Sequence, residues 1–356
     1  MSDLSREQVE AKLKKYIDPY LEKDLVSAKA VKDIKIDGGK VTIDIQLGFP
    51  ADGYHEDLTH EIKELVGDDT TVNISSKIST HKAQKGVKQM DGVKNIIAVA
   101  SGKGGVGKST TSVNLALALA AEGAKVGILD ADIYGPSQPR MLGVNAKPDS
   151  EDGQSLEPIE SYNLQAMSIG FLIDEETPMI WRGPMVTQAL DQLLNQTKWK
   201  DLDYLIIDLP PGTGDIQLTL AQRVPVSGCV IVTTPQDIAL LDARKALKMF
   251  EKVEVPVLGV IENMSIHICS KCGHEEHIFG QGGGSSMAEQ YDVDFLGALP
   301  LDMSIREGTD TGKPSVVAEP DGRIADIYRE IARRTTAKLS MQAKEHGAAF
   351  PNIVIS

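Results

Sequence analysis

The chain has 356 residues, and its 37 lysines and arginines against 51 aspartates and glutamates give a formal net charge of −14. This length suits one large α/β domain with a smaller second domain. Because the chain is acidic and has no local basic patch, we expect no nucleic-acid partner. The charged N-terminus lacks a secretory signal, and the apolar runs are far shorter than the roughly 20 residues that span a bilayer. We therefore expect a cytoplasmic protein without stable membrane association.

Residues 1–80 predict a small α+β domain, which opens with a helix. Ser5 and Gln8 have the spacing of a capping box, in which each side chain bonds the backbone of the other residue. This pattern predicts a helix that begins beside Ser5 and continues to about Lys23.

The rest of this region alternates between strand and helix patterns. Apolar and polar side chains alternate in residues 31–36 and 41–47, on either side of Gly38-Gly39, which predicts a two-residue β-hairpin. Residues 55–66 have a helical period of apolar side chains. Residues 71–78 are rich in β-branched side chains and alternate again, which predicts a third strand.

A polar segment at 81–94 has no apolar period and predicts a linker. It leads to a second domain over 95–345 and a short tail at 346–356. In this domain, short apolar runs alternate with helical segments, which is typical of a parallel, doubly wound sheet covered on both faces. The runs are Ile96–Ala100, Val126–Leu129, Tyr204–Ile207, Val230–Val232 and Val257–Ile261. Residues 141–181 show little periodicity, and we assign no firm structure to their first half.

A complete phosphate-binding loop follows the first of these strands. It consists of Gly102, Lys103, Gly104, Gly105, Val106, Gly107, Lys108 and Ser109, which match the pattern GxxxxGK[ST] directly before an apolar helix. Glycines allow successive backbone N–H groups to surround phosphate oxygens, and the helix adds its positive end. We expect Lys108 to reach the terminal phosphates of ATP, Ser109 to bind Mg²⁺ and the neighbouring Thr110 to contribute to the nucleotide site.

Carboxylates follow two other predicted strands. Asp208 ends a buried strand and is the candidate that holds the water shell of Mg²⁺. The run that begins there contains Gly212, whose backbone N–H could contact the γ-phosphate as a switch. Asp130 and Asp132 form a second acidic site, although either could simply cap a helix.

Two of the three cysteines are close together in the sequence. Cys229 lies within an apolar run and predicts core packing. Cys269 and Cys272 lie in a loop with the spacing of metal-binding thiolates. They could form half of a four-cysteine cluster site, a zinc site with a nearby histidine, or a redox dithiol. One chain closes a zinc site awkwardly, whereas two chains at a symmetry axis supply the four thiolates of a 4Fe-4S cluster.

The second domain resembles a known family. The extra lysine of the phosphate loop, the run Asp-Ala-Asp-Ile-Tyr-Gly-Pro-Ser at 130–137 and the run Asp-Leu-Pro-Pro-Gly-Thr-Gly-Asp at 208–215 are similar to the MinD-like deviant Walker A ATPases. Within these, the resemblance is to the Mrp/ApbC iron-sulfur carriers, from about Asn95 to about Leu339. The resemblance implies a P-loop ATPase that forms a homodimer around its nucleotides and carries a cluster on the Cys-x-x-Cys pair.

The resemblance also implies roles for individual residues. Lys103 would cross the dimer and contact the phosphates of the partner, which makes it a catalytic candidate beside Lys108. Asp132 would position the attacking water, and Asn263 would bind the adenine. Cys269 and Cys272 from two subunits would bridge the 4Fe-4S cluster.

The N-terminal region is similar to the small α+β domain that is fused ahead of Mrp-type ATPases and also occurs alone in cluster-assembly proteins. Many stand-alone versions have a cysteine after the second hairpin strand, where this chain reads Leu-Gly-Phe-Pro-Ala-Asp-Gly at 47–53. We therefore assign no metal or cluster ligand there. We expect the N-terminal domain to dock client proteins or assembly factors, with a passive folding module as the alternative.

We predict a homodimeric, ATP-hydrolysing 4Fe-4S carrier that transfers its cluster to apo-proteins. The competing hypothesis is a MinD-like regulatory or positioning ATPase with structural or zinc-bound cysteines.

Overall fold

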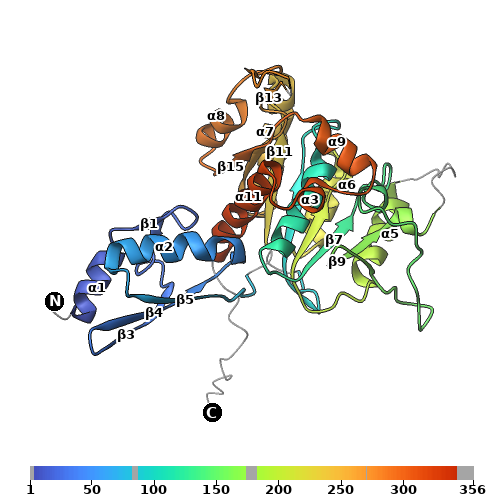
Figure 1. The fold of residues 1–356 in the computed structure, drawn as a ribbon. Coiled ribbons are helices and arrows are strands. Elements are labelled where there is room, and N and C mark those ends of the chain that lie inside the picture. The colour runs from blue at the N-terminus through green and yellow to red at the C-terminus, as the bar shows by residue number, and fades with distance from the viewer. Residues whose placement is uncertain (1–3, 82–86, 174–182, 270, 343–356) are drawn as a thin grey trace, which may run out of the picture.

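The computed structural model describes residues 4–81, 87–173, 183–269 and 271–342. Buried apolar side chains form two clusters. One includes residues of the first 66 positions, and the other extends from Val93 to Leu339. Figure 1 shows the smaller unit beside the larger one, with the C-terminal helix between them.

The first helix is shorter than the sequence predicts. α1 (Arg6–Leu13) begins with the predicted capping box at Ser5, but it ends ten residues before Lys23. Two short paired strands follow, β1 (Ile17–Asp18) and β2 (Lys23–Asp24). The predicted helix to Lys23 was wrong because Pro19 cannot donate a helical hydrogen bond. The Asp18 carboxylate also accepts bonds from the next backbone N–H groups, which competes with a helix.

A three-stranded sheet completes the small unit, in the order β3 (Val31–Asp37), β4 (Lys40–Leu47), β5 (Thr71–Ser76). The predicted hairpin is confirmed, and both turn glycines have positive φ. β5 pairs parallel to β4 after the crossover through η1 (Asp52–Tyr54) and α2 (His55–Val66), which was predicted as a helix.

Within the described ranges, the large unit is built on an eight-stranded sheet in the order β15-β12-β11-β6-β10-β7-β9-β8. All neighbouring strands are parallel except β8 and β9, so the predicted doubly wound α/β fold is confirmed. The strands are β6 (Val93–Ala100), β7 (Val126–Asp130), β8 (Ile159–Ser161), β9 (Leu164–Ser168), β10 (Leu202–Asp208), β11 (Gly228–Thr233), β12 (Val257–Glu262) and β15 (Phe295–Ala298).

Helices cover both faces of this sheet. α3 (Lys108–Ala121) and α11 (Arg323–Ser340) pack side by side on one face (Figure 1). Right-handed crossovers place α5 (Gly183–Asn195), α6 (Asp215–Arg223), α7 (Asp237–Lys252) and α8 (Gly283–Gln290) on the other face. Shorter elements complete the unit: α4 (Gln138–Met141), η2 (Ile169–Phe171), α9 (Met303–Asp310) and α10 (Ser315–Ala318).

The two units meet at a buried ion pair. Glu122 caps the C-terminal end of α3, and its Oε1 lies 2.6 Å from Nη2 of Arg333 on α11. From the small unit, the Gly53 N–H donates to Glu122, and Arg333 donates to the Tyr20 hydroxyl. Ala337 of α11 belongs to the small apolar cluster. The helix that starts at the phosphate loop therefore ends at the N-terminal unit.

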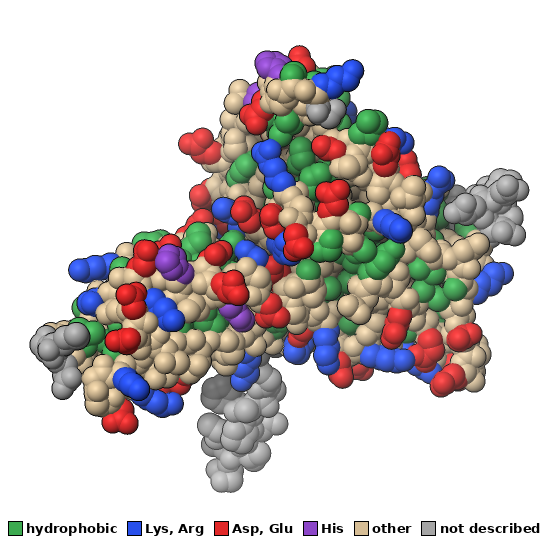
Figure 2. Space-filling model, in the orientation of Figure 1, with side chains coloured by type: hydrophobic (Ala, Val, Ile, Leu, Met, Phe, Trp, Pro, Cys, Tyr) green, Lys and Arg blue, Asp and Glu red, His purple; other side chains and the backbone are tan. Residues whose placement is uncertain are grey.

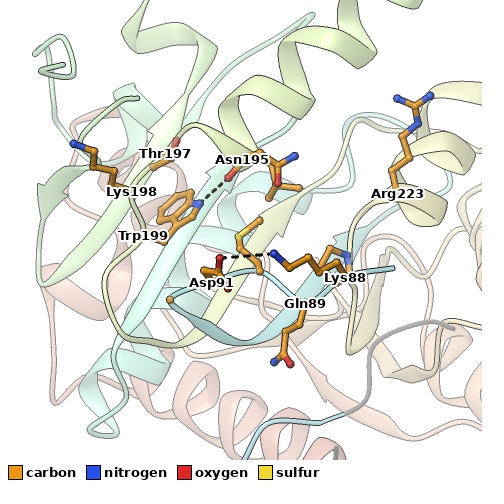
Figure 3. Close-up of a pocket in the computed structure, with 12 residues that line it drawn as sticks. Lys88, Gln89, Asp91, Asn195, Thr197, Lys198, Trp199 and Arg223 are labelled. Atoms are coloured by element: carbon orange, nitrogen blue, oxygen red, sulfur yellow. Dashed lines mark hydrogen bonds and ion pairs between the residues drawn. The ribbon is translucent and has the colours of Figure 1, made fainter. Parts of the chain in front are cut away.

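A cavity of about 460 Å³ lies at the amino ends of β6 and β10, where Lys88, Trp199 and Arg223 line it (Figure 3). Lys88 pairs there with Asp91 at 4.0 Å, and the Trp199 indole donates to a backbone carbonyl. Ligands of parallel sheets bind beyond the carboxyl ends of the strands. This cavity lies at the opposite end of β6 from the phosphate loop, so we do not assign it to the nucleotide.

The distribution of surface charge is relevant to the kinds of partner that the protein binds. On the face that Figure 2 shows, acidic side chains are interspersed with basic ones, and no broad basic area is visible. Among the described residues, no helix has the length and apolar character needed to cross a membrane.

Candidate nucleotide and cysteine sites

The phosphate loop connects β6 to α3, as predicted, and close contacts require the glycines at two of its positions. Gly107 precedes α3 with a φ of +81°. A Cβ there would lie 2.1 Å from Nδ2 of Asn263. A Cβ on Gly102 would lie 2.1 Å from the carbonyl carbon of Asp242 on α7. Larger residues at either position would push the loop away from its neighbours.

Lys108 and Asp208 form a buried ion pair at the start of α3. Their Nζ and Oδ1 atoms are 2.5 Å apart, and the side chains are 6% and 0% exposed. The Ser109 hydroxyl lies 3.2 Å from the same Nζ. Asp208 also accepts bonds from Ser112 at Oδ1 and from Gln138 at Oδ2. The structure thus brings the predicted phosphate lysine, Mg²⁺ serine and metal carboxylate together.

The loop after β7 is held by Asp130, which is fully buried. Its Oδ2 accepts bonds from the backbone N–H groups of Ser137 and Gln138 and from the Ser168 hydroxyl. Burial, reinforced by the charge of Asp208, raises the pKa of Asp130 to about 7. Asp130 therefore organises the loop that carries Asp132.

This buried carboxyl predicts a pH-dependent stability. The folded state keeps the proton of Asp130 up to about pH 7, whereas an unfolded aspartate loses it near pH 4. The stabilising contribution is therefore complete below about pH 4 and is lost as the pH rises to about 7, at up to about 1.4 kcal/mol per pH unit. Urea unfolding of the nucleotide-free protein between about pH 5 and pH 8 should show this decline, and Asp130→Asn should reduce it. An equal decline in Asp130→Asn and in the exposed control Asp68→Asn would contradict the assignment.

Asp132 lies at the edge of an open cavity. It is half-buried, and it lines a space of about 640 Å³ together with Tyr134, Pro211 and Gln217. Burial raises the pKa of Asp132, and the charge of Asp208 acts in the same direction while Lys108 opposes it. The cavity separates the loop after β7 from the loop after β10, so Asp132 faces space that a reacting group could occupy.

The remaining residues predicted for the nucleotide site differ in the hydrogen bonds and ion pairs that they form. The Gly212 N–H donates to the Ser101 carbonyl at 3.0 Å, so a contact with phosphate would require it to change partner. Lys103 is half-exposed and makes no ion pair with any residue that the structure describes. Gly104 and Gly105 are exposed, and the Thr110 carbonyl accepts a bond from the Asn114 side chain.

Asn263 joins the end of β12 to the phosphate loop. Its Nδ2 donates to the Val106 carbonyl at 2.9 Å, and its Oδ1 accepts the Met264 N–H. The structure therefore shows a support of the phosphate loop at this position. Adenine binding by Asn263 stays a prediction.

Cys269 and Cys272 lie at the tip of a hairpin formed by β13 (His267–Ile268) and β14 (Glu275–Glu276). The Cys269 N–H donates to the His274 carbonyl and closes the turn. Backbone N–H groups of Lys271 and Cys272 and the Cys272 thiol bond the Cys269 sulfur and lower its pKa. Cys269 is half-buried and Cys272 is exposed, which gives external molecules access to the pair.

The hairpin lies at the same edge of the sheet as the phosphate loop. β13 starts four residues after Asn263, which contacts Val106. His277 and Ser265 tie the hairpin to the end of β12 through a 2.8 Å contact between Nδ1 and the carbonyl. Cys229 is instead fully buried in β11, as predicted. Within the described ranges, no three His, Cys, Asp or Glu side chains converge to hold a metal in one chain.

Comparison with known proteins decides the family. A family profile described as NUBPL iron-transfer P-loop NTPase matches residues 92–336. The chain belongs to this family. A second profile, described as iron-sulfur cluster assembly protein, matches residues 6–74. This NUBPL-type P-loop NTPase thus has an assembly-type domain ahead of its nucleotide domain.

Relatives of this NUBPL-type chain match over most of their length. It is 50% identical to an iron-sulfur cluster carrier protein of Haemophilus influenzae, over 98% of this chain and 95% of the relative. It is 63% identical to one from Pseudomonas fragi, over 73% of this chain and 92% of the relative. The iron-sulfur cluster transfer protein NUBPL of Mus musculus is 51% identical over 71% of this chain and 80% of the relative.

Solved structures match the large unit. A nucleotide-binding protein of Archaeoglobus fulgidus, in complex with ADP, is 39% identical with a TM-score of 0.57 and covers 65% of this chain and 90% of its own. The cell division ATPase MinD of Pyrococcus furiosus, 23% identical with a TM-score of 0.51, covers 67% of this chain and 97% of its own. The second likeness shows the fold alone.

Two partners of Asp208 in this P-loop NTPase were not predicted from the sequence. Ser112 lies one helical turn after Lys108 and faces the same carboxylate, and this spacing could have revealed it. Gln138 follows the predicted acidic loop, but no motif singles it out. Only the folded loop shows that its side chain reaches Asp208 and the Ser109 carbonyl.

Proposed function

We propose that the chain binds and hydrolyses ATP and carries a 4Fe-4S cluster, which two copies hold between them and transfer to apo iron-sulfur proteins. The observation that carries this proposal is the accessible cysteine pair, with a lowered pKa at Cys269, at the same edge of the sheet as a complete phosphate loop. The relatives named iron-sulfur cluster carrier proteins support it.

The nucleotide half of the proposal uses the side chains around Asp208. Ser109 and Asp208 present oxygen atoms of the kind that Mg²⁺ prefers. A Cβ added at Gly105 or Gly212 would meet no atom within 4 Å, so these residues fit a phosphate group beside them. Lys108 would leave Asp208 for the terminal phosphates, and Mg²⁺ would supply charge neutralisation there.

Hydrolysis would use residues on both sides of the open cavity. Asp132 faces that space and would orient the attacking water. Lys103 has no ion-pair partner among the described residues, which leaves it available to the phosphates of a second copy. The Gly212 N–H would respond to the γ-phosphate by giving up its hydrogen bond to the Ser101 carbonyl and donating to the phosphate instead.

The cluster is the cargo. Two copies would supply two cysteines each, which gives the four thiolates of a 4Fe-4S site. The N–H bonds to the Cys269 sulfur stabilise a thiolate, and the exposed Cys272 is open to ligand exchange with an acceptor. We propose that ATP turnover gates loading or release.

We assign residues 1–80 to a domain that docks client proteins or assembly factors, residues 81–94 to a linker and residues 95–345 to the ATPase. The match of residues 6–74 to an assembly-protein profile supports this role. We place this activity in the cytoplasm.

Cluster binding can be tested with a double substitution. Anaerobically reconstituted wild-type protein should show the visible charge-transfer absorption of an iron-sulfur cluster, and Cys269→Ala/Cys272→Ala should lose it because no thiolate ligands remain at the hairpin. Cys229→Ala is the matched control, since its sulfur is fully buried in β11 and should not matter.

Iron, sulfide and zinc should be quantified in the same samples. Zinc in place of iron and sulfide, or an unchanged spectrum in the double variant, would refute the carrier function and favour the regulatory ATPase.

A further inference from the structure

One buried glutamine contacts both of the residues proposed to hold Mg²⁺, at the Asp208 carboxylate and at the Ser109 backbone carbonyl. Gln138 is the first residue of α4 and is 1% exposed. Its Nε2 donates to Oδ2 of Asp208 at 3.1 Å and to the backbone carbonyl of Ser109 at 3.2 Å. Its own N–H donates to Asp130, which fixes the start of α4. The residue is therefore held through its backbone N–H and through Nε2 of its side chain.

The orientation of the amide follows from its partners. Both contacts of Nε2 are oxygen acceptors, so the flipped amide would place Oε1 against a carboxylate and a carbonyl. Oε1 is then the atom without a hydrogen-bond partner among the described residues, although it is fully buried. A buried carbonyl oxygen without a donor is unusual and needs an explanation.

The side chains around Asp208 indicate which donor Oε1 of Gln138 lacks. Three described side chains already donate to the Asp208 carboxylate: Lys108 and Ser112 at Oδ1, and Gln138 at Oδ2. A Mg²⁺ ion keeps several water ligands, and each bound water donates outward. We propose that Gln138 is a positioning residue for Mg²⁺–nucleotide: Nε2 orients the Asp208 carboxylate, and Oε1 accepts a hydrogen bond from a water of the Mg²⁺ shell. This inference rests on the proposed nucleotide function.

The test compares ADP affinity with and without Mg²⁺. Wild-type protein should bind a fluorescent ADP more tightly in Mg²⁺ than in EDTA. Gln138→Met keeps the volume but removes both amide atoms, so it should reduce that Mg²⁺ enhancement by about tenfold while ADP affinity in EDTA stays within about twofold. Gln165→Met is the matched control, because the Gln165 amide on β9 bonds the Lys200 backbone instead of Asp208.

A second variant separates the acceptor from the donor. Gln138→Glu keeps an oxygen acceptor but replaces the donor that faces Asp208. It should weaken ADP binding in EDTA through repulsion, and it should reduce the Mg²⁺ enhancement less than Gln138→Met does, because only the group that orients Asp208 is lost. This variant also keeps the test open if Gln138→Met does not fold.

The possible results are distinct. An undiminished Mg²⁺ enhancement in either variant, or an equal loss of it in both, overturns the positioning role and leaves the proposed ATPase intact. A wild-type protein that binds no ADP, or binds it equally with and without Mg²⁺, overturns the proposed nucleotide function itself.

Discussion

Replacing Lys108 with alanine should reduce ATP hydrolysis by at least about a hundredfold, because the terminal phosphates lose the point charge that the loop places beside them. The Lys108 side chain is 6% exposed and is already directed into the site by its ion pair with Asp208. Steady-state phosphate release at saturating ATP and Mg²⁺ measures the effect.

The same substitution leaves Asp208 without its cation, so stability must be measured alongside turnover. Ser112 and Gln138 still donate to the carboxylate, and we expect the variant to remain folded. Lys125→Ala is the matched control, because this exposed lysine lies beyond the other end of α3. Turnover of Lys108→Ala within about twofold of the wild type, with a normal unfolding curve, would contradict the role of Lys108.

Much of the site could be predicted because its signals are local in sequence. The phosphate loop depends on glycine, lysine and serine at fixed spacing between a strand and a helix. Asp208 was predicted from its place at the end of a buried strand. The burial of Asp208 beside Asp130 could not be predicted, because it depends on β10 lying next to β7 with these two residues in register.

The errors and omissions also have physical reasons. The helix predicted to Lys23 failed because Pro19 and the Asp18 carboxylate favour a turn over a continued helix. β8 and β9 were missed in the irregular segment after Met141, although β9 supplies the Ser168 hydroxyl that bonds Asp130. Short strands next to polar loops gain their stability from pairing with a neighbour, which a sequence pattern does not show.

The contact between the two units is the feature of the structure that the sequence predicts least. Arg333 and Glu122 are 211 positions apart, yet their side chains are 9% and 0% exposed and 2.6 Å apart. The guanidinium also lies over the rings of Tyr20 and Tyr54. One helix, α3, therefore carries the phosphate loop at one end and the anchor of the N-terminal unit at the other.

Arg333→Met should lower the free energy of unfolding by roughly 3–5 kcal/mol, because it leaves the Glu122 carboxylate buried without its cation. The Gly53 N–H would remain as its donor from the small unit. Urea unfolding and the midpoint of thermal unfolding measure the loss, and limited proteolysis in the linker reports whether the small unit has come away from α3.

Arg334→Met is the matched control, since the neighbouring arginine on α11 is half-exposed and forms no ion pair with the described residues. The double variant Glu122→Gln/Arg333→Met should lose less stability than the sum of the two single variants, because no charge is then left buried alone. Equal losses in Arg333→Met and Arg334→Met, or strict additivity in the double variant, would show that the pair does not hold the two units together. If the pair does hold them, a movement of α3 that starts at the phosphate loop acts directly on the proposed docking domain.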